Sequence, residues 1–143
     1  MRYLLFLFLV LITKNFVNAQ ELPIGRFVGT SFSLEKNGVS FLTNKDLYYH
    51  SANLKIIRIS EDIYELTLSV YLQRTPETKT LSDTRVDKYQ VIWKDKRAGV
   101  LINKKKEHFR ELSEFLLFND TLTIKSRVSR NGVIETHSYK RDK

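Results

Sequence analysis

Apolar and polar residues alternate along most of the chain beyond residue 20, and a helical period of 3.6 residues is almost absent. The stretch "IYELTLSVYL" alternates most regularly, with Tyr64, Leu66, Leu68, Val70 and Leu72 on one face. Three other stretches place residues that are mostly apolar on a common face: Val28, Thr30, Phe32 and Leu34; Tyr89, Val91 and Trp93; Leu122, Ile124, Ser126 and Val128. A period of two is typical of strands with one buried and one wetter face. The pattern therefore predicts an all-β, antiparallel protein.

Turn residues separate these stretches. Asn37-Gly38 and Asn131-Gly132 are the strongest hairpin signals, because both central residues of such a turn take positive φ. The predicted strands cover residues 26–35, 39–43, 47–50, 54–60, 63–74, 86–95, 98–103, 112–118, 121–130 and 133–141. Short strands joined by short turns predict a meander, and closure of the meander removes its exposed edges. We therefore expect a single barrel of about eight strands.

Two stretches depart from the pattern. Residues 74–87, "RTPETKTLSDTRVD", are polar and predict either a flap over one end of the barrel or a long irregular loop. In residues 107–113, Phe109 and Leu112 lie three apart, and this spacing predicts a helical turn before the strand at 112–118.

The first nineteen residues have the organisation of a targeting segment. Arg2 precedes an apolar run from Tyr3 to Ile12, and Val17-Asn18-Ala19 has the spacing that a signal peptidase prefers. Residues 1–19 are therefore interpreted as a cleaved signal peptide of an exported protein, periplasmic or secreted. The alternative is a membrane anchor, but the run is shorter than the roughly 20 residues of a spanning helix. Residues 20–143 then suffice for one barrel domain.

Two short motifs resemble those of a known group. Gly25-Arg26-Phe27 resembles the Gly-x-Trp of lipocalin first strands, with Phe27 in place of the tryptophan. Arg141 resembles the arginine that packs against that ring from the last strand. The resemblance is to the calycin group, which comprises the lipocalins and their smaller bacterial relatives, and it extends over almost all of residues 20–143. It implies a lipocalin-like barrel with a central apolar cavity, and it names no ligand, because a fold does not fix a function.

The hairpin around Asn131-Gly132 carries the main candidate site. A two-residue loop there pairs Ser126 with His137 and Ile124 with Tyr139. The same register pairs Val128 with Glu135, and all six side chains share the inward face. A buried carboxylate or imidazole without a partner costs several kcal/mol. The cluster thus predicts mutual hydrogen bonding, a polar ligand group, or a position near an open barrel end that meets water.

The expected occupant is a small apolar or amphipathic molecule. His137 and Tyr139 resemble, in their spacing, the cationic residue and tyrosine that hold a carboxylate in fatty-acid-binding barrels. The predicted cavity is lined by Phe32, Leu66, Leu68, Val91, Trp93, Ile124, Ser126, Glu135, His137 and Tyr139. A barrel filled by its own side chains is the alternative.

Basic residues concentrate in the second half of the chain. Residues 20–84 carry seven Lys/Arg and eight Asp/Glu, whereas residues 85–143 carry fifteen Lys/Arg and eight Asp/Glu. This asymmetry indicates either a solubilised outer face or a surface for an acidic protein or an anionic envelope surface. Such a module is the alternative function, and export disfavours nucleic acid as its partner. The predicted basic surface comprises Lys94, Lys96, Arg97, Lys104, Lys105 and Lys106.

The sequence lacks the common catalytic signatures. It has no cysteine, which excludes thiol catalysis and cysteine metal sites. Its three histidines, His50, His108 and His137, have no HExxH spacing, and neither a Gly-x-Ser-x-Gly elbow nor a phosphate-binding glycine loop is present. We therefore predict a protein that is not an enzyme and that uses no metal or cofactor.

Overall fold

The computed structural model describes residues 20–43, 50–75, 78–105, 112–127 and 132–143. These residues form strands and turns without a helix, and so include no helix of the length and hydropathy that crossing a membrane requires. The nine strands are β1 (Gly25–Lys36), β2 (Val39–Thr43), β3 (His50–Arg58), β4 (Ile63–Thr75), β5 (Thr78–Trp93), β6 (Ala98–Asn103), β7 (Leu112–Phe118), β8 (Thr121–Arg127) and β9 (Val133–Arg141).

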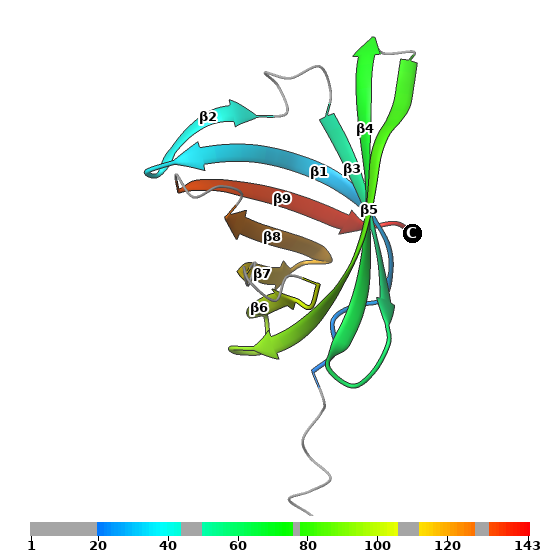
Figure 1. The fold of residues 1–143 in the computed structure, drawn as a ribbon, viewed down its shortest axis with the longest axis vertical. Coiled ribbons are helices and arrows are strands. Elements are labelled where there is room, and N and C mark those ends of the chain that lie inside the picture. The colour runs from blue at the N-terminus through cyan, green and yellow to red at the C-terminus, as the bar shows by residue number, and fades with distance from the viewer. Residues whose placement is uncertain (1–19, 44–49, 76–77, 106–111, 128–131) are drawn as a thin grey trace, which may run out of the picture.

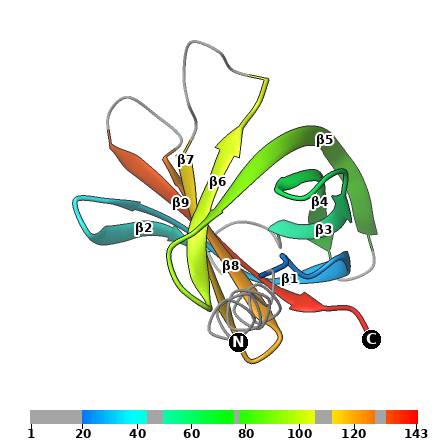
Figure 2. The ribbon, with the colours of Figure 1, turned by 90° about the horizontal axis from the view of Figure 1, so that it is seen from below.

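The strands form one closed antiparallel barrel (Figures 1 and 2). Each strand from β3 to β8 pairs with the next, and β1 closes the sheet by pairing with β3 on one side and β9 on the other. β3 pairs with the first residues of β1 and β2 pairs with the last ones. β2 and β3 therefore occupy the same strand position beside β1, and the barrel has eight strand positions. The predicted all-β meander barrel of about eight strands is confirmed.

Most predicted strand limits agree with the structure. The predictions for β2, β6, β7 and β9 match residue for residue. The predicted strand at 54–60 is part of β3, which ends at Arg58, and of the predicted strand at 47–50 only His50 lies among the described residues, where it begins β3. The described residues of the polar stretch, 74–75 and 78–87, do not form an irregular loop, because they belong to β4 and β5, which pair as a hairpin that projects beyond the barrel (Figure 1). Ladder pairing satisfies the backbone there without apolar side chains. Most of the predicted helical turn lies outside the described residues, and its last two residues begin β7.

Two hairpins have tight turns with both central residues at positive φ. Asn37 (φ 53°) and Gly38 (φ 76°) join β1 to β2 in a two-residue loop, as predicted. Asn119 (φ 47°) and Asp120 (φ 59°) do the same between β7 and β8. Asn and Asp tolerate this region better than other non-glycine residues, because their short side chains bond locally.

The residues of β1 that face inward differ from the prediction. A bulge between Gly29 and Ser31 inserts one extra residue opposite β9. Side chains therefore point inward at Phe27 and, beyond the bulge, at Phe32, while Val28 is 40% exposed. The prediction that Val28 and Thr30 share a face with Phe32 and Leu34 is wrong, because one added residue reverses the alternation.

An apolar core fills one half of the barrel. Residues 20–24, which precede β1 and are called the N-terminal segment, contribute to this half, because Leu22 is only 1% exposed. The backbone N–H of Leu22 donates to the Tyr64 hydroxyl at 3.2 Å. We call this half the floor; its most buried side chains are Leu22, Ile56, Tyr64, Leu101 and Leu122. The floor is closed by a residue that precedes the first strand.

Candidate functional site

The β8–β9 hairpin brings the predicted polar residues to the interior. Ser126 pairs with Glu135, and Ile124 pairs with His137. The predicted register is wrong by two residues, because β8 ends at Arg127 and β9 begins at Val133, so the connection is longer than two residues. A slip of two residues leaves every side chain on its face. The predicted inward directions of Ile124 and His137 therefore hold, and His137 is only 8% exposed.

Hydrogen bonds and ring contacts hold these side chains. His137 Nε2 and Glu135 Oε1 form a close hydrogen-bonded pair. The His137 ring lies 4.8 Å from the Phe32 ring and stacks on Tyr139 at 5.7 Å between centroids. Ser126 Oγ shares a hydrogen bond of 2.7 Å with Oγ of the buried Ser113. We call Ser113, Ser126, Glu135 and His137 the polar layer. It lies inside the barrel, beyond the apolar floor.

Arg85 and Asp83 form an ion pair on β5, on the side that faces Glu135 of the polar layer. The inward row of β5 runs from Val91 through Tyr89 to Asp87 and Arg85, and Arg85 pairs with Leu68 of β4. Arg85 Nε donates to Asp83 Oδ2 at 2.9 Å. This hydrogen bond, and then the negative charges of Asp83, Glu135 and Asp87, raise the pKa of Arg85 above its ordinary value, against the opposing effect of burial.

Sequence reasoning missed Arg85 and Asp87 as members of the inward row of β5, where Asp87 is partly buried and Arg85 remains exposed. Both lie in the polar stretch that was interpreted as a flap or loop. The sequence contained a signal for this, because the alternation that turns Tyr89 inward also turns Asp87 and Arg85 inward. Lys105 reaches Asp87 with Nζ 3.4 Å from Oδ1, so charges of both signs stand at this end of the barrel.

Burial keeps the Tyr139 hydroxyl neutral. Desolvation, and then the nearby Glu135 and Tyr89, raise the pKa of Tyr139 well above its ordinary value of about 10. A folded-state pKa above the unfolded one contributes stability that is present below pH 10 and is lost as the pH rises above it.

We therefore expect the free energy of unfolding to fall above pH 10 by up to about 1.4 kcal/mol per pH unit for this group. Urea unfolding at pH 8 and pH 11 measures the fall, and Tyr139→Phe should have a smaller fall than the unaltered protein. Tyr71→Phe, on the outward row of β4, is the control. Equal falls in Tyr139→Phe and the unaltered protein would contradict the assignment.

All ten predicted cavity residues lie on the inward face, but in two environments. Leu66, Val91 and Tyr139 belong to the packed core, and Leu68, Trp93 and Ile124 pack against it. The Trp93 ring meets Phe115 edge-on at 5.0 Å. Beyond the core lie Phe32, Ser126, Glu135 and His137.

The predicted basic surface divides into two groups at opposite ends of β6. Lys94, Lys96 and Arg97 lie in the β5–β6 connection, and Lys104 and Lys105 follow β6. Lys106 lies outside the described residues. Lys94 Nζ donates to Glu114 Oε1 at 3.0 Å, and Lys104 Nζ donates to Gln90 Oε1 at 2.9 Å.

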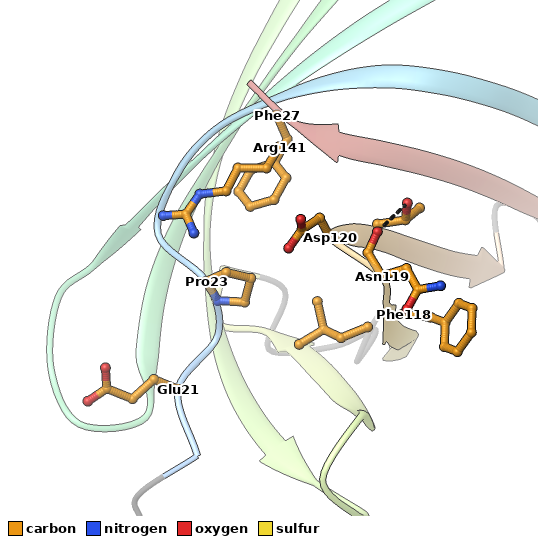
Figure 3. A pocket seen from close by; sticks show the side chains of 9 residues that line it. Glu21, Pro23, Phe27, Phe118, Asn119, Asp120 and Arg141 are labelled. Carbon is orange, nitrogen blue, oxygen red and sulfur yellow. Dashed lines mark hydrogen bonds between the residues drawn. The ribbon is translucent and has the colours of Figure 1, made fainter. Parts of the chain in front are cut away.

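A separate pocket of about 290 Å³ lies at the floor end (Figure 3). The N-terminal segment, with Glu21 and Pro23, forms one side, and the Asn119-Asp120 turn forms the other. Phe27 and Arg141, the two residues of the lipocalin resemblance, are direct partners between β1 and β9 and line this pocket together. Arg141 Nη2 donates to the Ile24 carbonyl at 3.3 Å, which ties the last strand to the N-terminal segment.

The described residues contain no group of three or more His, Asp or Glu side chains placed to hold a metal ion. No protein-family model matches the sequence, and no curated protein matches it.

Solved structures with similar folds exist. The siderocalin Ex-FABP superposes with a TM-score of 0.55 at 12% identity, over 83% of this chain and 73% of that one. The REP1-NXSQ fatty acid transporter matches with a TM-score of 0.46 at 16% identity, over 84% of this chain and 96% of its own. As-p18, an extracellular fatty acid binding protein, has a TM-score of 0.43 at 15% identity, over 83% and 95%. At such identities the likeness concerns the fold: the chain forms a calycin-like barrel.

Proposed function

We propose that the protein is an exported, non-catalytic barrel that binds a small apolar or amphipathic molecule in its interior. The observation that carries the proposal is the polar layer, in which Glu135 and His137 form a close pair beside Phe32 and above an apolar floor. Polar groups placed in an otherwise apolar interior are the usual way in which a pocket orients a ligand. The siderocalin of similar fold is described as having dual ligand specificities, which supports a binding role for such a barrel.

The arrangement favours a molecule with an apolar body and a polar end. The body would lie against Leu68 and Ile124, which are only partly buried where they border the core. The polar end would meet His137, Glu135 and Arg85. These groups include hydrogen-bond donors and acceptors and charges of both signs, so the preferred polar end both donates and accepts hydrogen bonds.

Two substitutions at neighbouring positions test interior binding. Ser126→Phe places a large ring in the interior, and Lys125→Phe places the same ring on the outer face one residue away. The probe is a dansyl-labelled undecanoic acid, an amphipathic molecule whose emission rises in apolar surroundings. We expect Ser126→Phe to weaken probe binding at least tenfold, because the ring occupies the ligand volume, and Lys125→Phe to leave it unchanged. Thermal unfolding checks that both variants fold.

Trp93 provides a second readout, because it is the one tryptophan of the chain and faces the interior. Probe bound inside the barrel should quench its emission by energy transfer. Native mass spectrometry of protein from its own source would look for a co-purifying small molecule. Binding that is equally strong in both phenylalanine variants would place the probe outside the barrel and contradict the proposal. Export has its own test, because the mature protein should begin at Gln20.

A further inference from the structure

The outer face of β5, β6 and β7 carries an apolar patch that is interrupted by Glu114, the cross-strand partner of Val100. The register pairs Ile92 with Val100 and Ile102 with Leu112, and such cross-strand neighbours lie about 5 Å apart. The three strands lie side by side (Figure 1). About half of the surface of Ile92, Leu112, Leu116 and Phe118 is exposed. We call the following side chains the outer patch: Ile92, Val100, Ile102, Leu112, Leu116 and Phe118.

Basic side chains flank the outer patch at both ends of β6. Arg97 lies at one end, with its guanidinium carbon 5.7 Å from the centroid of the Phe118 ring. The Leu117 N–H donates to the Arg97 carbonyl at 2.7 Å, which holds this residue beside β7. Lys104 lies at the other end of β6. The carboxylate of the outer face of β7, Glu114, is neutralised by Lys94 at 3.0 Å. Apolar contact area and positive charge therefore occur on the same face.

We propose that the outer patch and its flanking basic residues seat the protein on an anionic lipid bilayer. Half-exposed Leu, Ile and Phe side chains can enter the boundary between headgroups and acyl chains. Lys and Arg beside them are attracted to anionic headgroups by about 1 kcal/mol each. Charge complementarity thus selects an anionic surface over a zwitterionic one.

Two other occupants fit the same face less well. A dimer formed through this face would bring the basic residues Arg97, Lys96 and Lys104 of one copy close to those of the other. Like charges oppose that contact. An acidic protein would satisfy the charges, but the patch follows the outward-curved wall of a barrel. A fluid headgroup layer can follow such a wall more readily than a folded partner.

Vesicle co-sedimentation tests the apolar part. We expect binding to phosphatidylcholine vesicles that contain phosphatidylglycerol to be at least tenfold tighter than to phosphatidylcholine alone, and to weaken with added salt. Phe118→Ser should weaken it about fivefold, and Leu116→Ser with Phe118→Ser at least tenfold. Phe41→Ser is the matched control, because Phe41 on β2 is 54% exposed and Phe118 is 55% exposed. This control should change binding less than twofold.

A second pair of variants tests the charges. Arg97→Gln with Lys104→Gln should weaken binding about 25-fold, at about fivefold for each charge. Lys55→Gln with Lys140→Gln removes the same net charge from exposed positions on β3 and β9. This double variant should retain most of the affinity, because its charges lie away from the outer patch.

Four results would overturn the proposal. The first is the absence of binding to phosphatidylglycerol vesicles. The second is an equal loss in the patch variants and their controls. The third is a dimer in light scattering that Phe118→Ser converts to a monomer, because a second copy would then cover the patch. The fourth is binding to soluble poly-glutamate in place of vesicles that is lost in the Arg97/Lys104 variant, because an acidic protein would then be the partner. The outer patch is separate from the interior, so either proposal can fail alone.

Discussion

Replacing Gly99 by alanine is expected to lower the free energy of unfolding by about 3 kcal/mol, near the upper end of the cost of overpacking a core. A methyl group at this position would lie 2.6 Å from Cζ of Phe115 and closer still to the carbonyl oxygen of Ile92. The carbonyl cannot move away, because it belongs to the ladder in which Ile92 pairs with Val100. Phe115 is buried against Trp93, so its ring has little room to shift.

Urea unfolding followed by the emission of Trp93 measures this loss. Gly38→Ala is the control, since a methyl group there meets nothing within 4 Å. The control should cost about 1 kcal/mol, because Gly38 has a φ of +76° that disfavours alanine. A larger loss for Gly38→Ala than for Gly99→Ala would contradict the close approach of β5, β6 and β7.

Replacing Leu22 by alanine is also expected to cost about 3 kcal/mol, as for other buried leucines. Leu22 is 1% exposed and belongs to the core cluster, although it precedes the first strand. Its removal opens a cavity among Phe27, Tyr64 and the other floor residues. The matched control is Ile24→Ala, two residues away and 53% exposed, which should cost less than about 0.5 kcal/mol.

The two Leu22 and Ile24 variants are best compared by thermal and urea unfolding under the same conditions. Equal stabilities would show that the N-terminal segment does not close the floor. A loss confined to Leu22→Ala would show that the barrel includes this segment as part of its core.

Period two in the sequence was sufficient to predict most of the fold. Alternation placed Tyr64, Leu122 and His137 inside, and the structure has them there. The Asn37-Gly38 turn was predictable because its chemistry is local. These features depend on residues close together in the chain, where a single sequence carries most of its information.

The errors have long-range causes. The bulge at Gly29 reflects the place where β1 leaves β3 and bends toward β2, and glycine is required there because a methyl group would collide with the Ala52 backbone. The register of the β8–β9 hairpin depends on loop length, which the Asn131-Gly132 signal alone misjudged. Arg85 was missed because polar residues on both faces of a paired hairpin resemble a loop.

The residues of the candidate site were predictable, but the extent to which each of them is buried was not. The sequence identified Glu135, His137 and Tyr139 as one inward row. It could not tell that Tyr139 is part of the packed core while Glu135 remains a quarter exposed, since depth depends on Leu22 and on the strands across the barrel.

The pairing of β1 with β9 fixes the order in which the barrel can be completed during synthesis. The first strand must wait for residues 133–141 before its second neighbour exists. Until translation reaches the last turn, the growing polypeptide can form hairpins but not the finished ring. Closing so long a loop is slow compared with local hairpin formation. The nascent protein therefore stays incomplete until β9 is made, and this delay would suit the proposed export, in which a chain passes through a secretion channel in an unfolded state.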